Sequence, residues 1–567
     1  MIASITDRIY TNKSKNDTLL LYAALFVIAL VYLSTLSVNH SEAEDSLYYL
    51  MDISRGSLAD QVHPNHILYN LINFLFLNFW KLLGYEGGPE LPVKLVNIIG
   101  SLFSLLLVYL LATGLRFHII LRYFCVFAIA FSCGFWWYSV ECETYILPIV
   151  FVLLCLRQLM QIQIEFFRPA NHLLLAVFYA IAILFHQQHA LLGVPIIISY
   201  FLIFYFHRDK ITPKVFFSRI ILYILVCSLL VLVSYFIVAL LVKRLTTYDQ
   251  IANWAQGWMN KRPIKLGYWS IGSTVLGSIG FLRTFIGGHF LFSFESFSNF
   301  LQKNLPSFML KEEIFLVRDL NLFQSISLSL ASLCIVLALI WIIINISKAR
   351  FLTRSMSCET DSDRLRFFIT LLLLYLLTYS LFNIWWEPQN VEHWISIVPA
   401  SVLVFALFTN RIIHKLEIKV GIIIIAICLF FVNLIGSILP QTKQYNDYWY
   451  VFNSWFIENC NAKDVVLSGS GVISDGYVKY YSEAKVISIF PDPDDRPIEK
   501  KFQEFLHYQK PERILFSSTV YSPPEEYRQK FDIDYSAANG FFQRSRTYLT
   551  LLHCDSWQEI YLYNKDR

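Results

Sequence analysis

The chain has 567 residues, of which 56% are apolar, 17% aromatic and only 16% charged. A soluble domain carries about 25% charged residues, so this composition excludes an ordinary globular protein. Long apolar runs between short charged clusters indicate a multi-pass membrane protein. The formal net charge of +4 argues against nucleic acid as a partner, although cationic side chains could still meet anionic membrane lipids.

The first apolar run extends from Leu19 to about Val38, which is long enough to cross a membrane. No small-residue cleavage site stands out after it, so we expect a retained helix and not a cleaved signal peptide.

Hydropathy predicts about eleven membrane spans in an α-helical polytopic fold. The predicted spans are 18–38, 92–115, 123–140, 144–161, 172–186, 189–206, 216–241, 322–346, 366–385, 394–410 and 419–438. The segment 63–83 is apolar but interrupted by polar residues, which favours a helix lying at the membrane interface.

Basic clusters orient the predicted spans. With a cytoplasmic N-terminus, the inner connections carry Lys and Arg, as in 208–219 and 411–419, whereas the short outer connections near 187–188 and 386–393 carry neither. This is the positive-inside pattern. It places five polar clusters from distant parts of the chain on one outer face, together with everything after about position 440. These clusters are Glu44 and Asp45, His63 and His66, Glu141 and Glu143, His186 and His189, and residues 385–394.

Residues 441–567 are more charged, and we expect them to form a small extracytoplasmic α/β domain after a transmembrane domain over 1–440. The pattern predicts strands at 465–467, 485–490 and 513–518, helices at 477–482 and 498–508, and a hairpin or two edge strands at 547–552 and 559–563. The run Ser468-Gly469-Ser470-Gly471 lacks the third glycine of a dinucleotide-binding motif, because position 474 is Ser, and it predicts a plain tight turn.

The ten cysteines show no CxxC spacing, which argues against a zinc or iron–sulfur cluster. Most lie in apolar runs, as small buried residues would. Cys460 and Cys554 lie in the polar C-terminal region, where an extracytoplasmic location would permit a disulfide.

The first outer loop combines two features that are unremarkable separately. Acidic residues such as Glu44 and Asp45 are favoured in a first helical turn by the helix dipole alone. The later His63-Pro64-Asn65-His66 has its proline where helices commonly start. Their combination, followed by an amphipathic segment and by Leu91-Pro92-Val93-Lys94 at the second span, resembles the GT-C glycosyltransferases.

The resemblance covers roughly residues 18–210 and is closest to the branch of protein O-mannosyltransferases and lipid A aminoarabinose transferases, which is glycosyltransferase family 39-like. Lys94 would occupy that family's basic position before the second span. Asn65 stands where the family has a second proline, and Glu141 and Glu143 stand where it often has Arg and Asp. The segment 386–399 looks like the family's last outer loop.

The resemblance implies inverting transfer of a sugar from a polyprenyl-phosphate donor to a lipid, protein or glycan acceptor at the outer leaflet. A carboxylate would take the acceptor's proton, and the implied catalytic residues are Asp45, Glu44, Glu143 and Glu141. The phosphate leaving group needs cationic stabilisation, for which Lys94 and Arg283 are candidates. The other candidate substrate-binding residues are His63, His66, His186, His189, Trp386, Glu392 and His393.

A divalent metal ion stays open as a cofactor. Carboxylates from two loops could hold one jointly, and the spacing of His186 and His189 also permits metal binding. Some members of the superfamily need no metal.

Other functional classes also stay open. A transporter or flippase of lipid-linked saccharides would carry charged groups at mid-membrane and internal repeats, whereas these spans are nearly free of acid and show no repeat. A polymerase or ligase of envelope polysaccharide would share the donor but not the His-Pro loop. A scaffold would leave the one-sided clustering unexplained. We expect the bacterial inner membrane, with the endoplasmic reticulum membrane as the alternative.

Overall fold

The computed structural model describes residues 15–43, 45–257, 267, 269–304, 311–352, 359–489, 498–508, 511–523 and 536–564. Within this part of the chain, nine helical segments are long and apolar enough to cross a membrane. They are built on α2 (Lys15–Ser34), α5 (Glu90–Gly114), α8 (Leu147–Ile164), α10 (Gly193–Phe206), α11 (Pro213–Ile237), α16 (Leu322–Leu352), α17 (Glu359–Trp386), α19 (Val398–Thr409) and α20 (Leu416–Asn433).

The two remaining predicted spans are a bent pair and a shorter helix. α6 (Ile119–Ala130) and α7 (Cys133–Ser139) meet at an angle of 63°, and α9 (Pro169–Phe185) is an apolar helix of 17 residues. Every predicted span therefore contains a helix or a bent helix pair. The bend has a local cause, since Ser132 leaves the helical conformation with a ψ angle of 140°.

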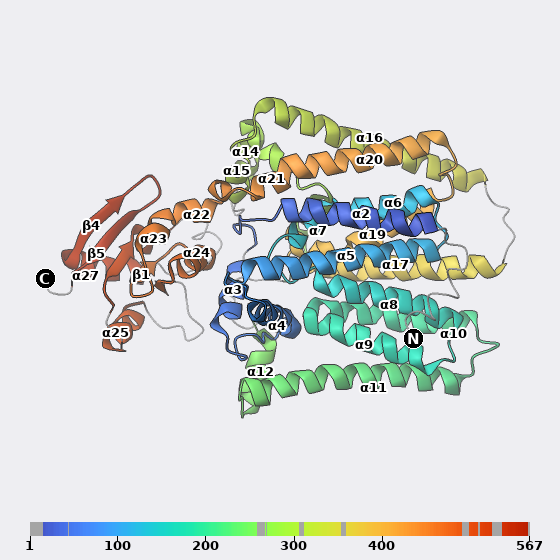
Figure 1. The fold of residues 1–567 in the computed structure, drawn as a ribbon, viewed down its shortest axis with the longest axis horizontal. Helices are drawn as coiled ribbons and strands as arrows, with labels where there is room; N and C mark the ends of the chain where they lie inside the picture. Colours follow the sequence, from blue (N-terminus) through green and yellow to red (C-terminus); the bar gives the residue numbers. More distant parts are fainter. Residues whose placement is uncertain are drawn as a thin grey trace.

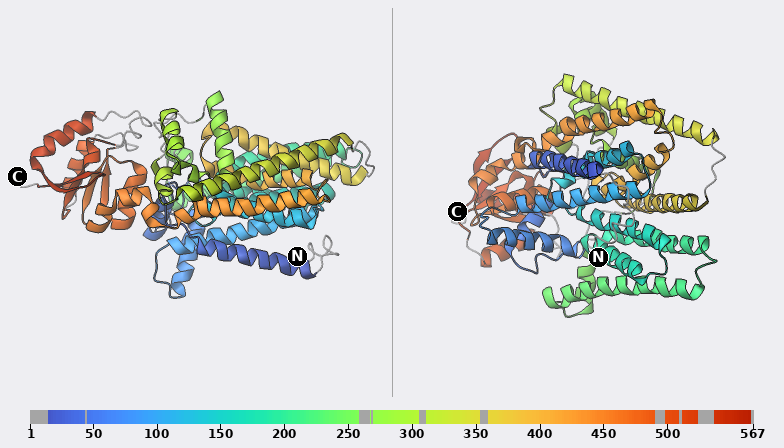
Figure 2. Two further views of the ribbon diagram at one scale, coloured as in Figure 1. Left: turned by 90° about the horizontal axis from the view of Figure 1, so that it is seen from above. Right: turned by 45° about the vertical axis from the view of Figure 1, so that its right-hand side comes forward.

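The spanning helices lie along one long axis, and an α/β unit extends beyond one end of the bundle (Figure 1). The C-terminus lies in that unit, whereas the N-terminal end of α2 points to the other end of the bundle (Figure 2).

Short helices cover the end of the bundle next to the α/β unit. They are α3 (Ser46–Arg55), α4 (Ile67–Leu82), α12 (Tyr248–Gln256), α13 (Ile271–Phe285), α14 (Glu295–Asn304), α15 (Lys311–Leu316) and α18 (Val391–Trp394). α4 is seen nearly end-on where α5 lies along the bundle axis (Figure 1). It buries Tyr69, Asn70 and Asn73 and exposes Leu75, Phe79 and Leu82, as expected of an amphipathic helix at an interface.

The α/β unit is built on a five-stranded mixed sheet in the order β2-β1-β3-β5-β4. Its strands are β1 (Val465–Ser468), β2 (Lys485–Ser488), β3 (Ile514–Ser517), β4 (Leu549–Cys554) and β5 (Glu559–Tyr563). Its helices are α24 (Val472–Ser482), α25 (Ile498–Tyr508) and α27 (Ser536–Ser545), and it is joined to the bundle through α21 (Leu439–Gln441), α22 (Tyr448–Phe452) and α23 (Ser454–Asn459).

The predicted elements of the C-terminal region are present. β1 pairs in parallel with β2 and β3, as β-α-β connections require, and β4 pairs antiparallel with β5. α24 begins five residues earlier than predicted because Gly471, with a φ angle of 95°, turns the chain directly from the end of β1 into the helix. Position 490, the predicted end of β2, lies outside the described residues.

The possible disulfide between Cys460 and Cys554 is not formed, because both residues are free thiols. Cys460 packs against the apolar cluster that contains Phe456 and Val466, whereas Cys554 is exposed at the end of β4, which is an edge strand. The two side chains therefore have different surroundings.

Candidate functional site

The polar clusters predicted to share one face meet at the end of the bundle beside the α/β unit. Three carboxylates act on Tyr49: burial first, then the charges of Asp45, Glu143 and Glu392, raise its pKa. Tyr49 Oη donates to Asp45 Oδ2 at 3.2 Å, and Tyr145 Oη donates to Glu392 Oε2 at 2.8 Å. We call Asp45, Glu143 and Glu392 the acidic cluster.

The members of the acidic cluster differ in exposure. Asp45 is exposed, whereas Glu143 is almost completely buried. Burial, followed by the charges of Glu392, Asp45 and Glu141, raises the pKa of Glu143 well above its usual value. Its Oε1 accepts from Ser46 Oγ at 3.2 Å, and its Oε2 has no hydrogen-bond partner. The raised pKa favours the protonated form of Glu143, and Asp45 is the carboxylate that an incoming molecule can reach.

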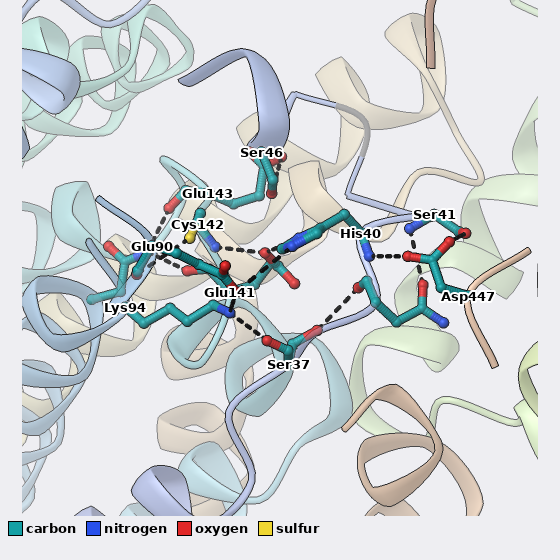
Figure 3. Close-up of polar contacts among 12 residues, drawn as sticks. Ser37, His40, Ser41, Ser46, Glu90, Lys94, Glu141, Cys142, Glu143 and Asp447 are labelled. Carbon is teal, nitrogen blue, oxygen red and sulfur yellow. Dashed lines mark hydrogen bonds and ion pairs between the residues drawn. The ribbon is translucent and has the colours of Figure 1, made fainter. Parts of the chain in front are cut away.

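A second set of side chains forms a continuous chain of ionic contacts (Figure 3). His40 Nδ1 lies 2.7 Å from Glu141 Oε1, and His40 Nε2 lies 3.8 Å from Glu90 Oε1. Lys94 Nζ contacts the same Glu90 oxygen and the carbonyl oxygen of Ser37. Lys94 thus lies near the start of α5, as predicted. Its ammonium group contacts Glu90 on the same helix and reaches the first outer loop at Ser37.

The same contacts fix the ionisation of Glu141. Burial acts to raise its pKa, but the charge and hydrogen bond of His40 and the charge of Lys94 lower it to about 2. The pKa of His40 is raised, because the charge and hydrogen bond of Glu141 outweigh burial. Asn97 Nδ2 donates to the carbonyl oxygens of Glu141 and Glu143, at 2.7 and 2.9 Å, and holds this loop against α5.

Removing one partner of this buried pair is expected to destabilise the protein. His40→Leu leaves the buried Glu141 without its hydrogen-bonded counter-charge and with only the charge of Lys94 nearby, and it should lower the free energy of unfolding by about 3 kcal/mol. Substituting both residues by Leu should cost less than the single change. The loss would be followed as Tm in lipid nanodiscs, and a double variant less stable than His40→Leu would contradict this account.

The pH dependence of this loss has a definite sign. The lowered pKa of Glu141 adds stability that is present above its usual value of 4.5 and is lost as the pH falls toward 2. The raised pKa of His40 adds stability that is present below 6.5 and is lost as the pH rises through its folded value. The difference in Tm between wild type and His40→Leu should therefore be greatest between pH 4.5 and 6.5.

Arg283 is the centre of a third group, here named the Arg283 cluster: Arg283, Glu42, Glu313 and His289. Arg283 Nη2 lies 3.4 Å from Glu42 Oε2 and Nη1 lies 3.5 Å from Glu313 Oε1, while His289 Nε2 lies 3.2 Å from Glu42 Oε1. Burial acts to raise the pKa of Glu42, but His289 and then Arg283 lower it. Burial and the charge of Glu42 raise the pKa of Glu313 to about 8. Near neutral pH, Arg283 therefore faces one ionised carboxylate, which it shares with His289.

Three of the predicted histidines, His63, His66 and His186, lie beside aromatic residues that contact the acidic cluster or beside one another. The rings of His63 and His66 stack with centroids 4.7 Å apart, and His66 lies edge-on to Tyr49 at 4.8 Å. The ring of His186 lies 5.1 Å from that of Tyr145. Burial lowers the pKa of His63 to about 4, and burial together with neighbouring histidines lowers that of His186. These rings are neutral near pH 7, so they offer hydrogen bonds and flat surfaces without charge.

The His-Pro-Asn-His turn is held by its backbone. The carbonyl oxygen of Pro64 accepts from Tyr235 Oη at 2.6 Å and from Gln187 Nε2 at 2.9 Å, and that of Asn65 accepts from Gln187 N at 2.9 Å. These bonds do not depend on a second proline, so the departure at Asn65 leaves the turn anchored between α9 and α11.

Three other predicted residues have different surroundings. His189 is buried, with Nδ1 3.0 Å from Tyr379 Oη inside the bundle. His393 lies 6.0 Å from the ring of Tyr145 and bonds to Glu387 at 3.2 Å, so it borders the acidic cluster. Trp386 packs on aromatic rings at the end of α17 and contacts no member of the acidic cluster in the described structure. Glu44 lies outside the described residues.

This chain matches known proteins in structure but not in sequence. No family model and no curated protein matches the sequence. The structure is similar to that of ArnT from Cupriavidus metallidurans bound to undecaprenyl phosphate, with a TM-score of 0.56 and 9% identity, over 97% of this chain and 98% of that one. The chain has the GT-C fold. The oligosaccharyltransferase of Archaeoglobus fulgidus, solved with Zn and sulfate, matches with a TM-score of 0.48 and 12% identity, over 93% of this chain and 71% of that one.

Sequence reasoning missed several polar residues of the candidate site. His40 and Glu42 stand in the same loop as Asp45, and Glu90 stands one turn before Lys94, so their positions were visible signals. His289 and Glu313 belong to the long connection 242–321, where no pattern distinguishes a site residue from a solvated one. Only their contacts with Glu42 and Arg283 identify them.

Among the residues that the structure describes, no three His, Cys, Asp or Glu side chains are arranged to hold a metal ion.

Proposed function

We propose that this protein is a glycosyltransferase that moves a sugar from a polyprenyl-phosphate donor to an acceptor at the extracytoplasmic face of the membrane. The observation that carries the proposal is the meeting, in a GT-C fold, of an exposed carboxylate, Asp45, with two groups of cationic side chains at one end of the bundle. Asp45 can accept a proton, and the cationic side chains can bind a phosphate.

The donor class is supported by chemistry and by likeness. The ArnT structure to which this chain is similar holds undecaprenyl phosphate. Lys94 and Arg283 are the cations available to a phosphate in the candidate site, and each now contacts carboxylates that a phosphate could replace. The exposed apolar surfaces of the spanning helices suit a long prenyl chain.

The proposed reaction is a single displacement. The hydroxyl of the acceptor attacks the anomeric carbon, its proton passes to Asp45, and the bond from that carbon to the phosphate oxygen breaks with its electron pair on the phosphate. Lys94 and Arg283 stabilise the charge that develops there. One displacement inverts the anomeric configuration. Glu392, held by the hydroxyl groups of Tyr138 and Tyr145, and His393 would contact the sugar.

The test is transfer in proteoliposomes with a panel of polyprenyl-phosphate sugars, with the anomeric configuration of the product determined by NMR. Transfer with inversion is the expected result. Movement of the donor between leaflets without transfer would favour a flippase, and retention of configuration would contradict the single displacement.

The proposed orientation places the N-terminus in the cytoplasm and the 441–567 domain outside, in the bacterial inner membrane. The exposed Cys554 gives a test. A membrane-impermeant maleimide added to intact spheroplasts should label the wild type, and Cys554→Ser should lose that label. Labelling of Cys554 only after lysis would show the opposite orientation.

A further inference from the structure

The first outer loop is bound along its length by the segment that joins the bundle to the α/β unit. The backbone amides of Val38 and Asn39 donate to the carbonyl oxygen of Gln441 at 3.0 and 3.2 Å. Asn39 Nδ2 donates to the carbonyl oxygen of Asn446 at 3.0 Å. Two segments about 400 residues apart in the sequence are thus paired, immediately before the loop reaches the acidic cluster.

Asp447 is the centre of this pairing. Its side chain is completely buried, and its oxygens accept four hydrogen bonds. Two come from the first outer loop: His40 N at 2.9 Å and Ser41 Oγ at 2.6 Å (Figure 3). Two come from the C-terminal region: Tyr450 N at 2.9 Å and Tyr477 Oη at 2.6 Å. One carboxylate therefore starts α22, fixes α24 and holds the loop.

Two turns transmit this restraint to Asp45. Ala43 N donates to the carbonyl oxygen of His40, and Ser46 N donates to that of Ala43, each at 3.1 Å. Asp45 is the residue immediately before α3. The backbone on both sides of Asp45 is thus tied to the residues that Asp447 holds.

The α/β unit also contacts the chain just after Asp45. Tyr48 Oη donates to the carbonyl oxygen of Val472, the first residue of α24, at 2.8 Å. Gly476, one turn further along α24, leaves space for the Tyr48 ring, because a Cβ there would lie 3.2 Å from the ring. Asp45 is therefore held from both sides by contacts with the C-terminal region.

We propose that Asp447 is a positioning residue that, together with α24, sets the place of Asp45 and makes the α/β unit a working part of the transferase site. The inference rests on the proposed function, since it assigns Asp45 the role of base. The chemistry favours a carboxylate, because Oδ2 accepts from His40 N and Tyr477 Oη while Oδ1 accepts from Ser41 Oγ and Tyr450 N. An amide at 447 keeps only one acceptor oxygen, and its NH₂ group faces a backbone N–H that it cannot accept from.

Hydrogen–deuterium exchange of the full-length protein in nanodiscs tests the restraint directly. In Asp447→Asn, the amides of residues 40–46 should exchange at least 10-fold faster than in wild type. Asp464→Asn is the matched control: Asp464 is as deeply buried, in the same unit, but bonds to Asn461 and Arg513 and not to the first outer loop. Equal exchange of the loop in wild type and Asp447→Asn would overturn the proposal.

Kinetics distinguish positioning from general damage. Asp447→Asn should lower kcat at least 10-fold while the Kd and binding stoichiometry of polyprenyl phosphate stay within twofold of wild type, and Tyr477→Phe should show a smaller loss of kcat. In an Asp45→Asn background, Asp447→Asn should add almost nothing, because the base it positions is absent. Losses that multiply instead would overturn the proposal. If the wild type transfers no sugar from any donor, the proposed function fails, and exchange still decides whether Asp447 holds the loop.

Discussion

Asp45→Asn is expected to lower kcat about 10³-fold, within the range of 10²–10⁴ found when a general base is removed. The amide has nearly the shape of the carboxylate but cannot take the acceptor's proton. Polyprenyl-phosphate binding should be unchanged, because the cations proposed for the phosphate, Lys94 and Arg283, contact other carboxylates in the free protein. The measurement is kcat for transfer in proteoliposomes beside Kd for the product lipid phosphate.

Two matched variants sharpen this result. Asp52→Asn changes an acidic residue of α3, the helix that begins directly after Asp45, whose partner is Arg55, and it should leave kcat nearly unchanged. Glu143→Gln replaces a buried side chain, whose raised pKa favours the protonated form, by a neutral one of similar shape, so its loss should be much smaller than that of Asp45→Asn. A larger loss in Glu143→Gln than in Asp45→Asn would reassign the base to Glu143.

Arg283→Gln is expected to lower kcat/KM for the donor about 10²–10³-fold, the range typical of losing one group that stabilises a developing negative charge. The raised pKa of Glu313 leaves Arg283 one ionised neighbour, Glu42, which His289 also contacts. Its charge is thus available to a phosphate. The measurement is kcat and KM as a function of donor concentration, with Tm measured in parallel.

Controls for this variant separate charge from folding. Arg318→Gln removes a cation whose contacts are the Phe315 ring and the Tyr445 carbonyl oxygen, outside the Arg283 cluster, and should change kcat/KM little. Arg283→Lys keeps the charge and should recover part of the activity. Unchanged kcat/KM in Arg283→Gln, with Tm retained, would remove this residue from the proposed mechanism.

The sequence predicted the arrangement of elements well because that arrangement follows from local composition. Long apolar runs must form helices in a membrane, where backbone polar groups have no other partner, and each predicted span contains a helix or the bent pair α6–α7. The strands of the C-terminal sheet were also predictable, since short β-branched runs flanked by turn residues mark them. The length of α24 was not predictable from the sequence, because it depends on the φ angle of Gly471.

The sequence indicated which loops contribute to the candidate site, but it did not indicate the role of each residue in it. Topology alone placed Asp45, Glu143 and Glu392 on one face, and the structure brings them around Tyr49. Nothing in the sequence distinguished Glu141 from Glu143, yet one pairs with His40 and the other is buried beside like charges. The cluster around Arg283 unites residues from the first loop and from the long connection, a pairing that no local pattern encodes.

The sequence by itself thus determined a polytopic helical membrane protein, the face on which its polar loops gather, and the strand and helix content of its C-terminal region, because each depends on residues near one another in the chain. Tertiary structure alone decided which carboxylate is exposed, which has a raised pKa and what holds the first outer loop. Those properties depend on burial and on neighbours about 100 to 400 residues away, such as Glu141 for His40 and Asp447 for Ser41.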